Sequence, residues 1–280
     1  MGSVPPDLDK RGSQSSWDNP LLKFHSSQLL QSSENPIDRA RLLATSSPEA
    51  GAWLQALPSP SLGLHLPNGS FRIACALRLG ADVCEQHRCP ACGCLVDKKG
   101  LHGLSCINSA GRHSRHSIVN DLIMRALISA GLPSVREPTG CNRADGKRPD
   151  GMTLVPWKRG KALIWDFTCS DTLAPSNILP SSKRAGAVAA RREAEKKNKY
   201  INLIDRFHFV PIAIESCGSW GCEGLNFIKE VGQRLSQFSG DTRASSFLIQ
   251  RISVAIQRGN VASMLGTLPP GKELEEVFLL

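Results

Sequence analysis

The sequence predicts an α/β fold, with a small mixed sheet flanked by helices and preceded by a cysteine-rich segment and a helical N-terminal segment. After residue 110 the predicted elements follow the order helix, strands, helix, strand, helices, which is typical of this class. The 280 residues include 41% hydrophobic residues, enough for a core, and no apolar run approaches the length of a membrane span. The N-terminus lacks the basic and apolar regions of a secretory signal. We therefore expect a nuclear or cytoplasmic protein that is not secreted and has no membrane partner.

Three segments surround the regions that carry motifs. Residues 1–34 are rich in Ser, Pro and other polar residues, which favours a disordered leader. Residues 35–84 contain Asn-Pro and Ser-Pro pairs at positions where a first helical turn tolerates proline, so a helical linker segment is expected. Residues 266–280 form a polar C-terminal tail with little pattern.

Residues 85–110 are expected to form a zinc knuckle. Their ligand pattern is Cys-x2-Cys-x9-His-x3-Cys, and thiols without a secretory signal are expected to be reduced. Two thiolates on a tight turn, followed by a His and a Cys, can close a tetrahedron around Zn²⁺. With four protein ligands the zinc would be structural, because no position is left for water. The expected ligands are Cys89, Cys92, His102 and Cys106. Cys84, His87 and Cys94 remain alternative ligands, and a loop of free cysteines is the alternative to a metal site.

Residues 111–265 are expected to form the α/β domain. Its first helix has an apolar stripe from Ile118 to Ala130, with Asn120 among the polar residues opposite. Strands are expected at 135–137, 149–155, 162–169 and 207–214, with a turn at 156–160 and helices at 183–203, 225–238 and 241–258. The strand at 162–169 is almost entirely apolar and should be central, whereas Pro211 favours an edge position for the last strand.

Positive charge is concentrated over the motifs. Residues 86–206 contain 21 Lys and Arg and 10 Asp and Glu, a net charge of +11, so the rest of the chain carries −2. This distribution favours a nucleic-acid partner, although an ordinary solvated basic surface would look the same. The candidate nucleic-acid contacts are Arg112, Arg115, His116, Arg148, Lys158, Arg159 and Arg192.

Two aspartates are candidate metal ligands. Asp150 and Asp166, with fifteen residues between them, lie on strands joined by a short turn, so both carboxylates can converge and hold Mg²⁺. Asp166 lies in an apolar run, where its carboxylate needs a cation, a proton or a donor. Many such aspartate pairs are structural. Glu137 is either a third acidic group or a surface partner for Arg136 or Arg143.

The predicted helix at 183–203 carries several cations. Arg192, Lys196 and Lys199 recur at helical spacing and share one face. A lysine near a scissile phosphate would orient water or stabilise the transition state. The alternative is a structural pair between Glu195 and Lys199, four residues apart.

These motifs together resemble a known family. The order knuckle, Arg115-His116, Arg148-Pro149-Asp150, Asp166 and Lys196-x-x-Lys199-Tyr200 is similar to the C-terminal part of site-specific non-LTR retrotransposon polyproteins, over about residues 85–215. In those polyproteins a zinc knuckle precedes a restriction-like endonuclease of the PD-(D/E)xK superfamily. The segment 50–84 looks similar to their linker between reverse transcriptase and knuckle.

The resemblance implies a restriction-endonuclease-like fold and an activity. It implies a DNA endonuclease, dependent on Mg²⁺ or Mn²⁺, that nicks its target and leaves a 3′-hydroxyl for a reverse transcriptase acting in cis or in trans. DNA is the implied partner, with RNA as a second nucleic acid. Asp150 and Asp166 match the metal-binding acids, and Lys196, Lys199 and Tyr200 match the helix that supplies the catalytic lysine.

The chain departs from the family pattern at three points. Thr168 stands where the usual Asp-x-Lys would place lysine, which fits either a lysine that has moved to the helix or a decayed site. The knuckle spacing of nine and three differs slightly from the family spacing. No Tyr-x-Asp-Asp polymerase motif is present, so the chain is expected to be a fragment, a truncated product or a separate descendant. An inactive nucleic-acid-binding relic and a protein scaffold are the competing functions.

Overall fold

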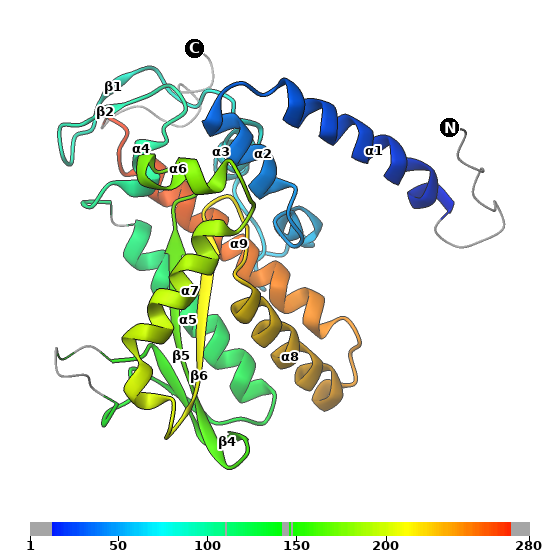
Figure 1. The fold of residues 1–280 in the computed structure, drawn as a ribbon, viewed down its shortest axis with the longest axis vertical. Helices are drawn as coiled ribbons and strands as arrows, with labels where there is room; N and C mark the ends of the chain where they lie inside the picture. Colours follow the sequence, from blue (N-terminus) through cyan, green and yellow to red (C-terminus); the bar gives the residue numbers. More distant parts are fainter. Residues whose placement is uncertain (1–12, 110, 142–145, 147, 270–280) are drawn as a thin grey trace.

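The computed structural model describes residues 13–109, 111–141, 146 and 148–269, and places helices around a small sheet (Figure 1). Among these residues no helix is both long enough and apolar enough to cross a membrane. The helices are α1 (Ser13–Ser32), α2 (Pro36–Thr45), η1 (Ala52–Gln55), α3 (Asn68–Leu79), α4 (His102–Ser105), α5 (Gly111–Ser129), α6 (Pro175–Ser181), α7 (Ala187–Lys199), η2 (Ile201–Leu203), α8 (Cys222–Ser239) and α9 (Ala244–Leu265). The strands are β1 (His87–Arg88), β2 (Leu95–Val96), β3 (Ser134–Arg136), β4 (Gly151–Lys158), β5 (Lys161–Ser170) and β6 (His208–Glu215).

The main sheet has the order β3-β4-β5-β6. The pairs β3–β4 and β4–β5 are antiparallel, and β5–β6 is parallel, so the sheet is mixed as predicted. The apolar strand β5 lies inside the sheet, and β6 pairs with β5 at an edge, as Pro211 had indicated. The chain is therefore a mixed α/β protein, as the sequence predicted.

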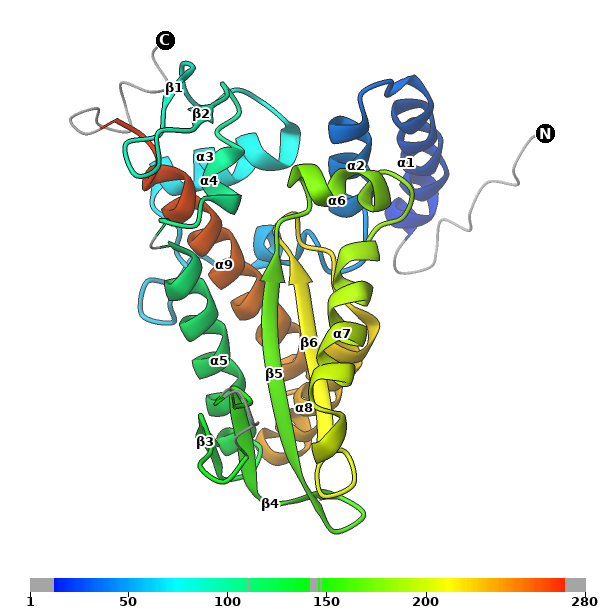
Figure 2. The same cartoon turned by 60° about the vertical axis from the view of Figure 1, so that its left-hand side comes forward.

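The alternation of side chains along β5 divides the sheet into two faces. Leu163, Trp165 and Phe167 join the largest apolar cluster, which α5, α8 and α9 complete. Ile164 lies in a separate cluster on the other face, where α7 packs along β5 and β6 (Figure 2). Because residues two apart share a face, Asp166 lies on the side of α7.

Two buried glutamates fix the start of α7 and of α8. Glu215, at the end of β6, accepts hydrogen bonds from the N–H groups of Val188 and Ala189 at 3.1 and 3.0 Å. Glu193 of α7 accepts from Glu223 and Gly224 at 3.2 and 2.8 Å, in the first turn of α8. These N–H groups have no partner within their own helix, and a carboxylate also suits the positive end of the helix dipole. The two contacts therefore hold α7 in place against the sheet.

Several predicted boundaries differ from the structure. The segment expected to be a disordered leader contains α1 over residues 13–32, whose last turn is tied to α2 because Arg39 Nη1 donates to Leu30 O at 2.7 Å. Strand β4 continues through Pro156, so the turn consists of Arg159 and Gly160, both with positive φ. Helix α7 ends at Lys199 rather than at residue 203, and α9 extends to residue 265. Within the predicted tail, residues 270–280 lie outside the described part of the chain.

Candidate metal centre and active site

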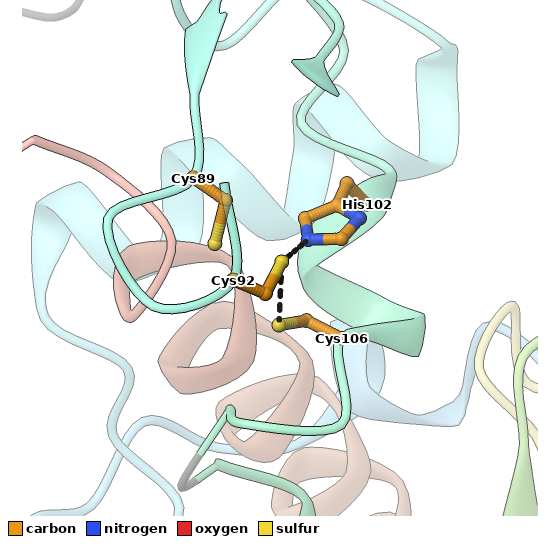
Figure 3. Close-up of side chains that lie close together, drawn as sticks. All are labelled: Cys89, Cys92, His102 and Cys106. Carbon is orange, nitrogen blue, oxygen red and sulfur yellow. Dashed lines mark hydrogen bonds between the residues drawn. The ribbon is translucent and has the colours of Figure 1, made fainter. Parts of the chain in front are cut away.

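The four predicted zinc ligands converge in the structure (Figure 3). Their ligand atoms all lie within 4.8 Å of one another. Cys89 and Cys92 come from the turn between β1 and β2, where Cys89 N donates to Cys94 O at 2.8 Å. Cys106 N donates to His102 O at 2.9 Å, so these two side chains leave α4 one turn apart and on the same side.

The distances within this cluster fit zinc. Cys92 Sγ lies 3.8 Å from Cys106 Sγ and 3.1 Å from His102 Nε2. Two sulfurs at tetrahedral corners, each about 2.3 Å from zinc, would be about 3.8 Å apart. The N–H of Cys94 lowers the pKa of Cys92 to about 6, which favours the thiolate that binds metal. This Cys₃His cluster could therefore hold zinc with all four positions filled by protein.

The three alternative ligands lie outside the converging set, and two of them have other partners. Burial raises the pKa of Cys84 to about 11, and its Sγ faces two backbone carbonyl oxygens at 3.4 and 3.6 Å. Both ring nitrogens of His87 lie 2.8 Å from backbone carbonyl oxygens. The side chain of Cys94 is exposed and outside the group of converging ligand atoms. The structure thus selects one of the ligand sets that the sequence left open.

Asp150 and Asp166 lie opposite each other on one face of the sheet. Gly151 of β4 pairs with Trp165 of β5, and Asp150 N donates to Trp165 O at 3.0 Å, which continues the ladder by one residue. Side chains of residues opposite each other in such a ladder point to the same face. A Cβ on Gly151 would lie 2.0 Å from the Trp165 ring, so the indole fills the space over the glycine on the other face. The two acids therefore share the face that α7 covers.

Helix α7 brings two ammonium groups to Asp166. Lys196 Nζ and Lys199 Nζ lie 2.9 and 3.6 Å from Asp166 Oδ2, and the carboxylate is only 6% exposed. The closer contact is an ion pair without hydrogen-bond geometry, and Oδ2 has no hydrogen-bond donor among the described residues. The predicted pair of Glu195 with Lys199 is not formed, because Glu195 contacts arginines of its own helix. These two ammonium groups offset the cost of burying the carboxylate, and they bring the lysines of α7 to the acid pair.

The pKa values of Asp150 and Asp166 are shifted in opposite directions. Burial raises the pKa of Asp166, and the nearby carboxylate of Asp150 adds to this, although the charge of Lys196 opposes it. Burial also acts on Asp150, but the hydrogen bond and charge of His116 outweigh it and lower the pKa of that carboxyl. Asp150 is therefore the more readily ionised member of the pair.

Three residues that the sequence did not assign to this site form a chain behind Asp150. Trp165 Nε1 donates to Asn120 Oδ1 at 3.0 Å, and Asn120 Nδ2 lies 3.3 Å from His116 Nδ1. His116 Nε2 lies 3.3 Å from Asp150 Oδ2 and 3.2 Å from Phe167 O. Because the Asn120 amide donates to Nδ1, the proton of a neutral imidazole is on Nε2, facing Asp150.

The structure corrects two expectations for α5. Asn120 was placed on the polar face of the helix but is fully buried, and His116 was expected to contact nucleic acid but contacts an acid. One sequence signal was present: Asn120 follows His116 by four residues, so both lie on one face of the helix. Nothing in the sequence indicated that Trp165 lies against that face.

The buried side chain of Tyr200 contacts residues next to the acid pair. Its side chain is 1% exposed, and its hydroxyl donates to Arg148 O at 3.0 Å, two residues before Asp150. Lys199 Nζ lies 4.6 Å from the centre of the Tyr200 ring. The contacts described for Tyr200 thus position the segment before Asp150 and one of the two lysines.

Glu137 is not brought to the acid pair. Its side chain is 56% exposed and forms an ion pair with Arg148, while its backbone has a φ of 49°. The surface interpretation is therefore the one that the structure favours, with Arg148 as the partner. Arg136 donates instead to Ser117 Oγ at 3.2 Å, and Arg143 lies outside the described residues.

Lys158 and Arg159 lie at the far end of the β4–β5 hairpin. Lys158 is eight residues beyond Asp150, roughly 26 Å along an extended strand. Its Nζ donates to Glu230 Oε2 at 2.6 Å, and Arg159 forms part of the turn. These two predicted nucleic-acid contacts are therefore not part of the acidic site.

A cavity of about 390 Å³ gathers the remaining predicted basic residues. It is bounded by α4, the first turns of α5, the end of β5, α6 and α7, so the knuckle and the sheet share it. Thr168 forms part of one wall. The cationic residues that line it are Arg112, Arg115, Arg192, Lys196 and Lys199.

Two comparisons with known proteins do not assign the chain to a family. Comparison with models of protein families gives no match, and comparison with curated proteins gives none either. A functional assignment therefore depends on the residues and geometry described above.

Proposed function

We propose that the protein is a metal-dependent DNA endonuclease with a restriction-like PD-(D/E)xK fold, which nicks its target by phosphodiester hydrolysis. The observation that carries this proposal is the meeting of Asp150, Asp166 and Lys196 on one face of the sheet. Two carboxylates can hold Mg²⁺ or Mn²⁺ for phosphodiester hydrolysis, and one ammonium group can stabilise the charge that develops on the phosphate.

Asp150 and Asp166 would hold the ion. Two observations fit this role: the side chains of Asp150 and Asp166 lie opposite each other on one face of the sheet, and the pKa of Asp150 is lowered. When bound, Mg²⁺ or Mn²⁺ supplies an activated water and neutralises charge on the phosphoryl oxygens. Lys196 would stabilise negative charge on the phosphate in the transition state, and Lys199 would provide a second cation.

Thr168 is consistent with an intact site under this proposal. In the superfamily that the chain resembles, a lysine usually stands at this position, two residues after the second acid. Thr168 lines the same cavity as Lys196, so a lysine reaching the cavity from α7 can take the place of the missing one. This placement favours a lysine that has moved to the helix over a decayed site.

The knuckle supports the same proposal. A Cys₃His cluster that could hold zinc precedes the acidic site, in the order found in non-LTR retrotransposon polyproteins. We therefore propose DNA as the partner, with RNA as a second nucleic acid. A reverse transcriptase acting in cis or in trans would extend the 3′-hydroxyl, in the nucleus or the cytoplasm.

Nicking of supercoiled plasmid tests the proposal. The zinc-loaded full chain is incubated with Mg²⁺, with Mn²⁺ or without added divalent ion, beside Asp150→Ala, Asp166→Ala and a surface control, Asp241→Ala. Metal-dependent nicking that both site variants lose and the control keeps would establish the nuclease.

A second candidate function is an inactive nucleic-acid-binding relic. Its specific support is Thr168 at the usual lysine position. Salt-dependent DNA binding without nicking, at any metal concentration, would favour the relic. Absence of DNA binding would favour the third candidate function, a scaffold for protein contacts.

A further inference from the structure

The cavity between the knuckle and the acidic site has an excess of positive charge. Of its two acidic lining residues, Glu195 is already paired with Arg192 at 2.7 Å. The other, Asp171, accepts hydrogen bonds through Oδ1 from Leu173 N and Ser216 Oγ, both at 3.0 Å. Neither acid forms an ion pair with Arg112 or Arg115 among the described residues, although both arginines lie close enough to Asp171 for their charges to oppose the rise of its pKa on burial. The cavity is therefore electropositive.

Arg115 is the most informative of these residues. Its side chain is 3% exposed, and its Nε has no hydrogen-bond partner among the described residues. Nη1 donates to Asn260 Oδ1, a neutral acceptor. A guanidinium remains charged at all physiological pH values, and burying a charge without an ion-pair partner is unfavourable. The charge of Arg115 acts on the carboxyl of Asp171, but burial raises the pKa of that carboxyl and disfavours its charged form. An anion in the cavity would remove this cost.

The arginine is also held in place. A Cβ added at Gly259 of α9 would lie 2.5 to 2.8 Å from the Cβ, Cγ and Cδ atoms of Arg115, so the aliphatic stem packs directly against that helix. Close contact with backbone leaves the stem little freedom to move away. Arg112, one turn earlier on α5, is exposed and lines the same cavity. One rigid and one adjustable guanidinium can bind the oxygens of a tetrahedral phosphate.

Lys196 and Lys199 connect this cavity to the acidic pair. Both line the cavity, and both contact Asp166, so an anion in the cavity would be a close neighbour of a phosphate at the acids. Successive phosphates of one nucleic-acid strand provide such a pair of neighbouring anions. A free phosphate provides the same chemistry at the cavity alone.

We propose that this cavity binds a backbone phosphate of the nucleic-acid strand through Arg112 and Arg115, adjacent to the phosphate held at Asp150 and Asp166. The strand then passes between α7 and α4, and the knuckle forms one wall of its path. The choice of a strand rests on the proposed function, whereas the anion site rests on the cavity itself.

Salt-dependent DNA binding tests the proposal without cleavage. Fluorescence anisotropy with a labelled duplex is measured on the zinc-loaded full chain, without added Mg²⁺, between 50 and 300 mM salt. The variants are Arg112→Gln, Arg115→Gln and the double variant. Arg251→Gln is the matched control, because Arg251 is an exposed arginine that lines a separate cavity between α5, α8 and α9.

Each single variant is expected to reduce the slope of log K against log salt, and the double variant to reduce it by about 0.9, the value for one phosphate contact on duplex DNA. The same slope corresponds to a loss of affinity of about eightfold near 0.1 M salt. The double variant is expected to lose no more than one contact, because both arginines serve one phosphate. The control should match the wild type. Circular dichroism verifies folding, and Arg112→Gln carries the test if Arg115→Gln does not fold.

Unchanged slopes in both arginine variants would overturn the proposal. If inorganic phosphate raises the melting temperature of the wild type but not of Arg112→Gln, while the DNA slopes are unchanged, the ligand is free phosphate and the strand assignment is wrong. Reduced slopes in a protein that never nicks would support the cavity and contradict the nuclease. Nicking with unchanged slopes would contradict only the cavity.

Discussion

The zinc cluster and the acidic site are assembled from very different lengths of chain. The four cluster ligands lie within residues 89–106, on one turn and one short helix. The acidic site combines α5, β4, β5 and α7, over residues 116–199. The short helix of the cluster packs against α9 at Met264, and the metal could close the four ligands. The acidic site is positioned by the sheet and by helix contacts such as Glu215 at the start of α7. A substitution in the zinc cluster should therefore affect the structure only near the cluster. A substitution in the acidic site should affect several elements of the α/β domain.

Loss of the zinc ligands gives the largest expected effect. Cys89→Ser should reduce the zinc content from about one ion per chain to none and unfold the knuckle, because metal binding and folding of such segments are coupled. The main sheet should remain folded, since the cluster ligands are not part of it. Elemental analysis and hydrogen exchange over residues 85–106 measure both effects.

Cys94→Ser is the matched control for the cluster. Its side chain is exposed and outside the converging ligand set, so zinc should be retained. Loss of zinc in this variant, or loss of the sheet in Cys89→Ser, would contradict the local character of the cluster.

The second largest effect is expected for a substitution in the interior of the acidic site. Asn120→Leu removes the acceptor of the Trp165 indole and the donor to His116, all within a fully buried position. Leaving a buried donor unpaired should lower the free energy of unfolding by about 1–3 kcal/mol. Nicking should fall as well, because His116 no longer holds Asp150. Urea denaturation and the plasmid assay measure the two effects.

Asn198→Leu, on the exposed surface of α7, is the control for that substitution. It should change the free energy of unfolding by less than about 0.5 kcal/mol. If the two variants are equally stable, the contacts through Asn120 do not support the site.

The difference between the zinc cluster and the acidic site also explains which of their residues could be predicted from the sequence. The knuckle ligands were found because a metal site made from neighbouring residues leaves a spacing, and the structure then excluded Cys84 and His87. The central position of β5 and the edge position of β6 followed from an apolar run and from Pro211. The two aspartates and the lysine helix were likewise visible as motifs, and the structure brings them together.

The partners of those acids were not predictable, because they depend on which surfaces of distant elements meet. The burial of Asn120 requires Trp165 from β5, and the burial of Arg115 requires Gly259 from α9. The surface role of Glu137 follows from its pairing with Arg148. Contacts between such distant elements cannot be inferred from the spacing of residues in the sequence.

The smallest expected effect is a pH dependence of stability. The hydrogen bond to Asp150 raises the pKa of His116, although burial opposes it. A raised pKa in the folded state means that the protonated pair stabilises the protein fully below about pH 6.5, the usual histidine value. This contribution is lost as the pH rises through the raised pKa.

His116→Gln isolates that contribution. Without added divalent ions, the difference in unfolding free energy between wild type and variant should shrink as the pH rises from 6 to 9. Urea denaturation at a series of pH values measures it. A difference that stays constant over this range would mean that His116 does not form a charged pair with Asp150.

The most direct test of the acidic site compares two neighbouring lysines of α7. Lys196 contacts Asp166 at 2.9 Å, whereas Lys197 pairs with Glu223 at 2.7 Å on another side of the helix. Rates of plasmid nicking with Mg²⁺ are measured for Lys196→Met and Lys197→Met. We predict a fall of about 10²–10³ for Lys196→Met, the size expected for loss of a group that stabilises transition-state charge, and a change of less than about twofold for Lys197→Met. Equal rates for the two variants would contradict a catalytic site built from the aspartate pair and α7.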